Sequence, residues 1–292
     1  LPRSSLDPGG WRDAAIRRIA MRMQSFPDVP ILRDAPEVAL PEADDRMRRS
    51  VEHAAVRHWL TLTTVIQGLA DRPWGTLDPL VQAALTAGAA QIFYMDSIPD
   101  HAAVHETVEW TKRSVRTGAG GFVNAVLRRL LAQRVEWVPD GAEASLHARD
   151  LLPRPDGGAW RIERPYLPKP AHKHLAKLTS HPTALIRRWH DQYGPDRAAH
   201  LALHSLVIPP VVLTGADLSG IDGLVAHEEA GFWILESGRG ALEEVLGAHP
   251  EARVQDVSTA AAVASTSDFE PELIIDFCAG LGTKTRQLAD LH

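Results

Sequence analysis

The stretch LIIDFCAGLGTKT (Leu273–Thr285) joins a short apolar run to a glycine-containing loop and to the start of a helical pattern. A continuous apolar run of this length is typical of a strand buried between helices in a parallel sheet. Glycines let the backbone turn sharply, and a helix that begins directly afterwards presents free amides to an anion. The stretch therefore predicts the first strand, loop and helix of an α/β domain that binds a nucleotide or a cofactor.

Three kinds of ligand match this loop to different degrees. A phosphate-binding P-loop needs glycine directly before the lysine, where this chain has Thr283, so that interpretation fails. A dinucleotide fingerprint starting at Gly280 would have Thr285 in place of its third glycine, which weakens it. S-adenosylmethionine is the third possibility, because Asp276 ends the strand and small residues follow it. A simple strand-to-helix turn with no ligand stays open beside it, and the loop alone does not decide.

The composition is that of ordinary globular domains. The chain has 292 residues, 45% of them apolar and 23% charged, which suffices for two domains. No apolar run reaches the length of a membrane span, and the first residues show no signal peptide, so we expect a cytoplasmic protein with a trimmed N-terminus. The single cysteine, Cys278, excludes an internal disulfide and a cysteine-based zinc site. We interpret this cysteine as a small packed residue rather than a nucleophile.

The net charge of -6 is unevenly distributed. Residues 1–134 hold 17 Lys+Arg against 15 Asp+Glu, whereas residues 135–292 hold 14 against 22. A local basic face is enough to contact RNA phosphates, because such contacts depend on local potential. The candidate RNA-binding residues lie on two predicted helices: Arg17, Arg18, Arg128 and Arg129. For Arg128 and Arg129, a merely solvated helix face remains the alternative.

Apolar spacing and proline content divide the chain into four regions. Residues 1–134 predict an all-helical bundle, with helices at Trp11–Phe26, Met47–Leu69 and Leu80–Met95, one from near Asp100 or His101, and one after the TGAGG segment (117–121). Residues 135–182 hold seven prolines and predict a Pro-rich linker with a hairpin around Pro155–Gly158. Residues 183–260 predict a small helical and α+β subdomain, and residues 261–292 the incomplete start of the cofactor-binding domain.

Four motifs together carry a resemblance to a known family. LDPLVQAALTAGAAQIFYMDSIPDHAAVHETVEWTKR (77–113), followed by GAGGFVNAVLRRLL (118–131), resembles the helical RNA-binding domain of the antitermination factor NusB. SHPTALIRRWHDQYG (180–194), VQDVSTAAAV (254–263) and DFCAGLGTKT (276–285) resemble later motifs of bacterial rRNA cytosine-5 methyltransferases, the ribosomal RNA small-subunit methyltransferase B (Sun/Fmu) group. The motifs occur in the order of that family.

The resemblance implies a fold, a reaction and a cofactor. The fold would be a NusB-like bundle, a small α+β unit and the first strand, loop and helix of a class I, Rossmann-like methyltransferase domain. The parent enzyme would methylate carbon 5 of a cytosine in small-subunit rRNA, with S-adenosyl-L-methionine as methyl donor. The expected partner is RNA, with no membrane, no metal and a monomeric chain. The implied cofactor-binding residues are Asp276, Cys278, Ala279, Gly280, Leu281, Gly282, Thr283 and Lys284.

The resemblance is incomplete where the chemistry would occur. Leu281 stands where the family has proline, Gly280 where it has alanine, and Thr283 where it has a second glycine. The catalytic cysteines of the family lie in later motifs, so we expect a sequence truncated just after the cofactor motif, with no catalytic residue and no activity alone. The alternative is a non-catalytic RNA-binding adaptor of NusB type that acts in antitermination. A helical scaffold that binds protein is a third possibility.

Overall fold

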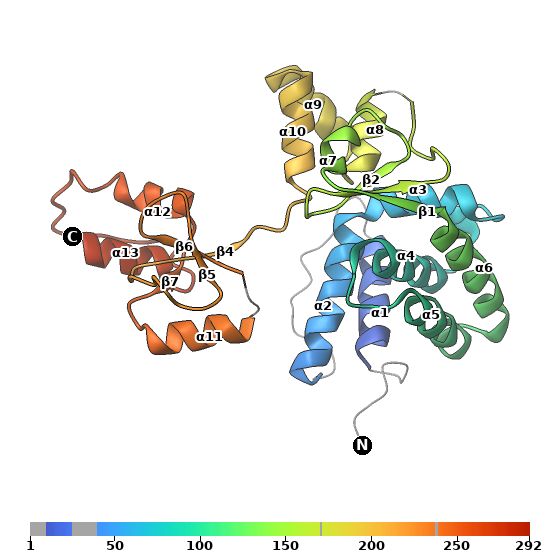
Figure 1. Ribbon diagram of the computed structural model, residues 1–292, viewed down its shortest axis with the longest axis horizontal. Coiled ribbons are helices and arrows are strands. Elements are labelled where there is room, and N and C mark those ends of the chain that lie inside the picture. Colours follow the sequence, from blue (N-terminus) through green and yellow to red (C-terminus); the bar gives the residue numbers. More distant parts are fainter. Residues whose placement is uncertain (1–9, 25–39, 170, 237–238) are drawn as a thin grey trace. The chain divides into compact units, whose positions relative to one another are not determined.

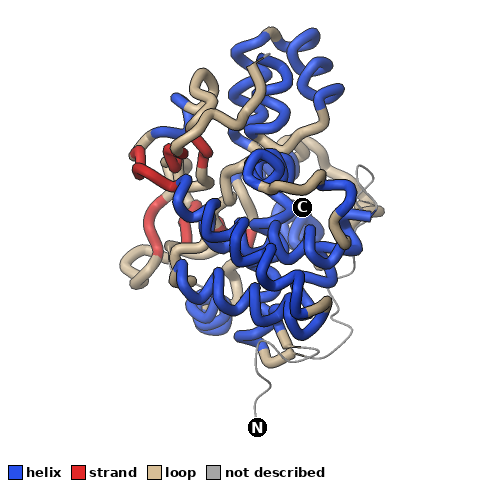
Figure 2. The backbone as a smooth tube through the Cα atoms, turned by 90° about the vertical axis from the view of Figure 1, so that its right-hand side faces the viewer, coloured by secondary structure: helices blue, strands red, loops and turns tan. Residues whose placement is uncertain are grey.

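The computed structural model describes residues 10–24, 40–169, 171–236 and 239–292 (Figure 1). The chain divides into two compact units, Leu1–Val207 and Ile208–His292, and each is described by itself. Helices make up most of the described chain, and the strands are short (Figure 2). Among the described residues, no helix combines the length and the apolar character that a membrane crossing requires.

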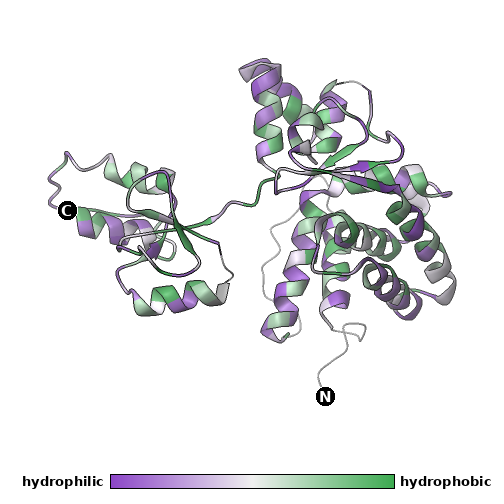
Figure 3. Ribbon diagram, viewed as in Figure 1, coloured by the Kyte–Doolittle hydropathy of each residue, from purple (hydrophilic) through white to green (hydrophobic). Residues whose placement is uncertain are grey.

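The first unit is built around a central helix, α4 (Pro79–Tyr94). This helix is apolar on nearly all sides and is mostly hydrophobic in Figure 3, which is the pattern of a helix enclosed by others. Asp78 caps its start and Pro79 occupies its first position. It contacts five other helices, namely α1 (Trp11–Gln24), α2 (Glu42–Arg57), α3 (Trp59–Leu69), α5 (Asp100–Ser114) and α6 (Thr117–Gln133). A 3-10 turn, η1 (Trp74–Thr76), precedes α4. The predicted helical bundle is therefore present.

One stretch predicted as a single helix forms two helices instead. Residues 47–69 form the end of α2 and the whole of α3, which separate at His58. The Ser180 hydroxyl oxygen accepts a hydrogen bond from the backbone amide of Leu60 at 3.1 Å, and so satisfies a donor at the start of α3. The Thr61 hydroxyl donates to the carbonyl of Leu178 at 2.9 Å. The new helix start is thus stabilised by residues over a hundred positions away, which local spacing does not reveal.

The TGAGG segment (117–121) belongs to α6 rather than preceding it. A Cβ atom at Gly120 would lie 2.4 Å from the Cγ atom of Lys112 on α5. In the same way, a Cβ at Gly88 would lie 2.9 Å from the δ-methyl groups of Leu127 on α6. These glycines therefore allow close helix packing instead of forming a turn.

The predicted Pro-rich linker, 135–182, is wrong. It forms a three-stranded antiparallel sheet in the order β1 (Arg134–Val138), β3 (Ala159–Ile162), β2 (Leu151–Pro153), followed by α8 (Ala171–Leu178). A short helix, α7 (Gly141–Ala144), lies between β1 and β2, and the predicted hairpin around residues 155–158 joins β2 to β3. Side chains from this region enter the core of the bundle, namely Leu152, Ile162, Leu167 and Leu178. Burial of these side chains holds the region against the helices despite its prolines.

Two further helices complete the first unit, α9 (Thr183–Tyr193) and α10 (Pro195–His204). They pack with α8 around a small apolar core of Leu175, Ala176, Ile186 and Ala202. This core is separate from that of the bundle. The region predicted as one subdomain, 183–260, is therefore divided: its two helices lie in the first unit and its strands in the second.

The second unit contains an antiparallel sheet in the order β5 (Leu224–Ala226), β6 (Phe232–Leu235), β4 (Val211–Thr214), β7 (Arg253–Val254). Its helices are α11 (Arg239–Ala248), α12 (Val257–Ala264) and α13 (Thr283–Leu291). The predicted buried strand at residues 273–277 is wrong, because these residues form no strand pairing in the described chain. Leu273 is 76% exposed and Phe277 92% exposed. A Rossmann-like sheet is accordingly not present among the described residues.

His58, the residue at the break between α2 and α3, leads to a prediction about how folding stability depends on pH. The His58 ring stacks on Tyr94 with ring centroids 3.6 Å apart, and its side chain is buried. Burial, together with the charges of Arg57 and Arg154, lowers the pKa of His58 to about 3. The unfolded chain takes up this proton near pH 6.5, whereas the folded chain resists it, so folding stability falls as the pH drops below about 6.5.

We predict that His58→Phe, which keeps an aromatic ring against Tyr94, removes this dependence. The free energy of unfolding, measured by urea titration, should fall between pH 7.5 and pH 5.5 in the unmodified chain. This fall should be about 1.4 kcal/mol larger than in the variant. The other histidines act as an internal control, since both proteins carry them. Equal pH dependence in the two proteins would contradict the assignment to His58.

Candidate functional site

The glycine-containing loop begins with a turn that Asp276 closes. Its Oδ1 accepts a hydrogen bond from the backbone amide of Cys278 at 3.0 Å, and its Oδ2 accepts one from the hydroxyl of Thr285 at 2.8 Å. Gly280 and Gly282 have φ values of 57° and 84°. Only glycine adopts that left-handed region without strain, so both glycines are required by the backbone. The loop therefore has a defined conformation although no strand precedes it.

The helix that follows the loop is held by the backbone of α12, by Gln255 and by Arg253 of β7. Gln287 of α13 donates to the carbonyl of Ala260 at 3.0 Å and accepts from the side-chain amide of Gln255. Arg253 and Asp290 form an ion pair at 3.2 Å. No side chain caps the N-terminus of α13. Its first amides are therefore placed to meet an anion.

A groove of about 630 Å³ lies beside the loop within the second unit. Of the eight predicted cofactor-binding residues, three line it, namely Ala279, Thr283 and Lys284. The opposite wall consists of Pro209, Pro210, Val211, Val212, Val254, Gln255, Asp256 and Thr259. The other five predicted residues do not line this groove: Asp276, Cys278, Gly280, Leu281 and Gly282.

Cys278 is exposed, which contradicts its interpretation as a packed residue. The apolar strand that was expected to cover it is absent from the described chain, and its neighbour Leu281 is fully exposed as well. Cys278 has no disulfide partner. Among the described residues, no group of three His, Cys, Asp or Glu side chains could hold a metal ion.

The predicted RNA-binding arginines occupy different environments. Arg17 is about half exposed and pairs with Asp13 at 2.9 Å. Arg18 is buried and pairs with Glu52 at 2.8 Å, so its proposed role on an RNA-binding face is wrong. Neighbouring positions on a helix differ by about 100° in direction, which explains why one arginine faces water and the next one does not.

The arginines of α6 are both exposed. Arg128 donates to the side-chain oxygen of Asn124 at 3.2 Å, and Arg129 pairs with Asp71 at 2.8 Å. Arg128 lines a wide groove of about 1190 Å³ between α5 and α6. That groove also presents Glu106 and Glu109, so its charge is mixed. This face is less favourable for a polyanion than two adjacent arginines suggest.

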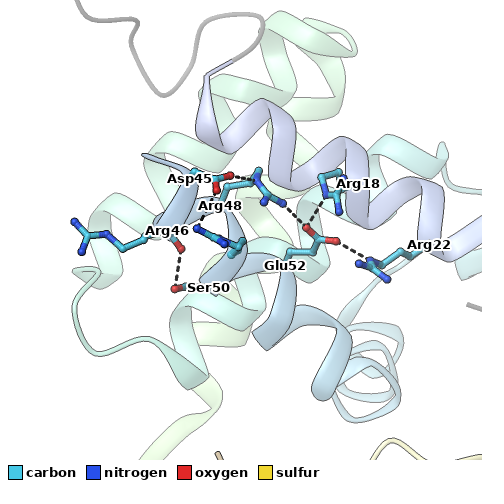
Figure 4. Close-up of polar contacts among 8 residues, drawn as sticks. Arg18, Arg22, Asp45, Arg46, Arg48, Ser50 and Glu52 are labelled. Carbon is cyan, nitrogen blue, oxygen red and sulfur yellow. Dashed lines mark hydrogen bonds and ion pairs between the residues drawn. The ribbon is translucent and has the colours of Figure 1, made fainter. Parts of the chain in front are cut away.

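Sequence reasoning missed a buried network of charges between α1 and α2 (Figure 4). The carboxylate of Glu52 accepts from Arg18 at 2.8 Å, from Arg22 at 2.7 Å and from Arg48 at 2.7 Å. Arg48 also pairs with Asp45, which in turn pairs with Arg49 at 3.0 Å. Glu52 is 1% exposed. Arg48 and Glu52 are four positions apart on α2, and Arg18 and Arg22 are four positions apart on α1. This spacing, which puts each pair on one face of its helix, is the one signal of the network that the sequence offered.

Comparison with known proteins shows what the helical bundle is similar to. The model of the NusB family matches residues 20–132, which cover α2 to α6 and part of α1. These residues form a NusB-like domain. The antitermination protein NusB of Ralstonia pickettii is 36% identical over 81 residues, which cover 28% of this chain and 52% of that protein.

The similarity extends beyond the NusB domain. A protein of Bacillus subtilis named probable ribosomal RNA small subunit methyltransferase B is 28% identical over 226 residues, covering 73% of this chain and 44% of that protein. The resemblance to this group is thereby confirmed. The chain spans less than half the length of that relative. A solved structure titled "Crystal Structure of PH0851" matches all of this chain and 62% of its own with a TM-score of 0.55, and at 14% identity it indicates the fold alone.

The buried network generates a second prediction. Glu52→Gln removes the carboxylate that neutralises three buried or half-buried guanidinium groups. Breaking such an arrangement typically costs about 3–5 kcal/mol, because the buried charges left behind lose a carboxylate that offset their desolvation. A urea titration followed by tryptophan fluorescence measures the loss.

The matched control is Glu42→Gln on the same helix, where the carboxylate is mostly exposed and 4.0 Å from Arg46. Its effect should stay within about 0.5 kcal/mol. If the Glu52 variant unfolds at the same urea concentration as this control, the network does not stabilise the contact between α1 and α2.

Proposed function

We propose that this chain is the RNA-binding part, with the first cofactor motif, of an S-adenosylmethionine-dependent methyltransferase that modifies carbon 5 of a cytosine in small-subunit rRNA. The observation that carries the proposal is the combination on one chain of a NusB domain and similarity over 226 residues to proteins named ribosomal RNA small subunit methyltransferase B. Because the chain spans 44% of such a relative, catalysis belongs to the longer protein. Its place of action is the cytoplasm.

The loop of residues 276–284 is compatible with one end of S-adenosylmethionine. The backbone at Gly280 and Gly282 is open, since a Cβ at Gly282 would meet nothing within 4 Å. The uncapped start of α13 offers amides to a carboxylate, and Lys284 adds a positive charge at the groove. When bound, the cofactor supplies an activated methyl group. The residues of this chain contribute binding and orientation of one end of the molecule.

Asp276 has a positioning role in this proposal. Both of its carboxylate oxygens accept hydrogen bonds from within the loop, from Cys278 and from Thr285. The carboxylate therefore fixes the course of the backbone toward α13. Cys278 keeps a place in the loop through its backbone amide, and its thiol has no part in the reaction.

The alternative function is that of an RNA-binding adaptor of NusB type with no catalytic partner. It is favoured by the match of residues 20–132 to the NusB family and by the 36% identity to an antitermination protein. Both functions require RNA binding by the first unit. They differ in whether the second unit recognises the cofactor.

We predict that the polypeptide of residues 1–292 binds a fragment of unmodified small-subunit rRNA, with a logarithm of affinity that falls linearly with the logarithm of salt concentration. Each phosphate contact contributes a slope of about 0.7–0.9. Arg128→Glu combined with Arg129→Glu should flatten the slope and weaken binding. Arg128 should account for the larger part of both effects, because Arg129 is paired with Asp71. Absence of binding to the fragment in low salt would refute the proposed function.

We also predict that residues 1–292 transfer no methyl group from labelled S-adenosylmethionine to the same RNA. The only thiol, Cys278, lies in the cofactor loop, and a covalent adduct with cytosine requires a cysteine that faces the base. The Bacillus subtilis relative serves as the positive control. Methyl transfer by residues 1–292 that Cys278→Ala abolishes would make this thiol the nucleophile and overturn the prediction.

A further inference from the structure

A separate cavity in the first unit combines cationic and hydroxyl side chains. Its volume is about 540 Å³, and it lies between α1, α2, the turn from α8 to α9, and the end of α10. The described residues that line it are Arg22, His53, Val56, Arg57, Thr179, Ser180, His181, Ser205 and Leu206. Aspartate and glutamate are absent from this set. The groove beside Arg128, by contrast, includes acidic side chains.

The buried charge network described above reaches this cavity through one of its arginines. Glu52 is shared by three arginines, one of which, Arg22, lines the cavity. Asp45 is shared by Arg48 and Arg49. Positive charge attracts an anion most strongly where it reaches solvent.

Arg57 is the residue of the cavity whose charge is least compensated. It follows Glu52 by five positions on α2, on the side of the helix that faces the cavity. It forms no ion pair with any carboxylate of the described part of the chain. Its positive charge is close enough to lower the pKa of the buried His58, although burial is the larger cause.

The far wall of the cavity places the start of a helix beside these side chains. Ser180 has a φ of 56°, one of two non-glycine residues with positive φ in the described chain. In this conformation its hydroxyl accepts from the amide of Leu60 at the N-terminus of α3. The positive end of the α3 dipole therefore points toward the wall that Ser180 forms.

We propose that this cavity binds a phosphate group of the RNA backbone, with Arg57 as its principal contact and Arg22, His53 and His181 around it. The proposal rests on the proposed function. Guanidinium groups bind phosphate through parallel hydrogen bonds. No Trp, Tyr or Phe is among the described lining residues. The cavity accordingly recognises RNA without reading its sequence.

The first experiment measures the salt dependence of binding to the small-subunit rRNA fragment for residues 1–292 and for two variants. Arg57→Gln should reduce the slope by about 0.7 and weaken binding about fivefold at 0.1 M salt. Arg46→Gln is the matched control: it removes the same charge from the same helix, outside the cavity, where the side chain is 53% exposed. Equal slopes for the two variants, with RNA binding intact, would overturn the proposal that this cavity binds RNA phosphate. The proposed function would stay in place.

The second experiment uses inorganic phosphate and is independent of RNA. The imidazole resonances of His53 and His181 should shift on titration with phosphate and stay unchanged with sodium chloride at equal ionic strength and pH. The shifts should be lost in Arg57→Gln and kept in Arg46→Gln. Absence of shifts in the unmodified chain would overturn the phosphate site. Shifts with phosphate but no binding of the rRNA fragment would overturn the assignment to RNA, and with it the proposed function.

Discussion

A single buried carboxylate joins the first two helices of this protein. Glu52 lies between α1 and α2 and accepts hydrogen bonds from Arg18, Arg22 and Arg48. Without it, three guanidinium groups would be brought together in a poorly hydrated space, which is unfavourable. Both α1 and α2 also contact α4, so the neutralisation lies at the contact between two helices that pack against the centre of the bundle. The same arrangement orients Arg22 toward the neighbouring cavity, so that a structural ion network also shapes a surface.

The helices of the bundle could be predicted because their apolar residues recur at helical spacing. The α4 and α5 helices begin at or next to the expected residues, where Asp78 and Pro79, or Pro99 and Asp100, mark a helix start. In the sheet β1-β3-β2, local patterns predicted only the hairpin that joins β2 to β3. Its strands are three to five residues long, and the pairing of β1 with β3 joins segments separated by about twenty residues.

The candidate site was predicted in part, for physical reasons that differ between residues. The loop and α13 follow from the glycines and from the small residues that precede the helix, and both are present. The prediction of a strand before them was wrong. An apolar run needs neighbouring strands for its backbone hydrogen bonds, and the described chain supplies none at residues 273–277. Arg18 could not be separated from Arg17 by sequence, since burial depends on where Glu52 lies. The support of α13 by Gln255 and Gln287 is likewise a tertiary contact that no spacing rule indicates.

The hydroxyl of Ser180 at the start of α3 has a consequence for how this protein evolves. Ser180 lies 48 positions beyond the last residue that the NusB family model matches, yet it satisfies an amide inside that match. Leu152, Ile162, Leu167 and Leu178 complete the apolar core of the bundle from the same downstream region. A recombination event that moved residues 20–132 alone to another gene would transfer a module with an unsatisfied helix end and an uncovered core. The structural unit that this arrangement forms is therefore longer than the family domain, and substitutions in α3 and around Ser180 should affect its stability together.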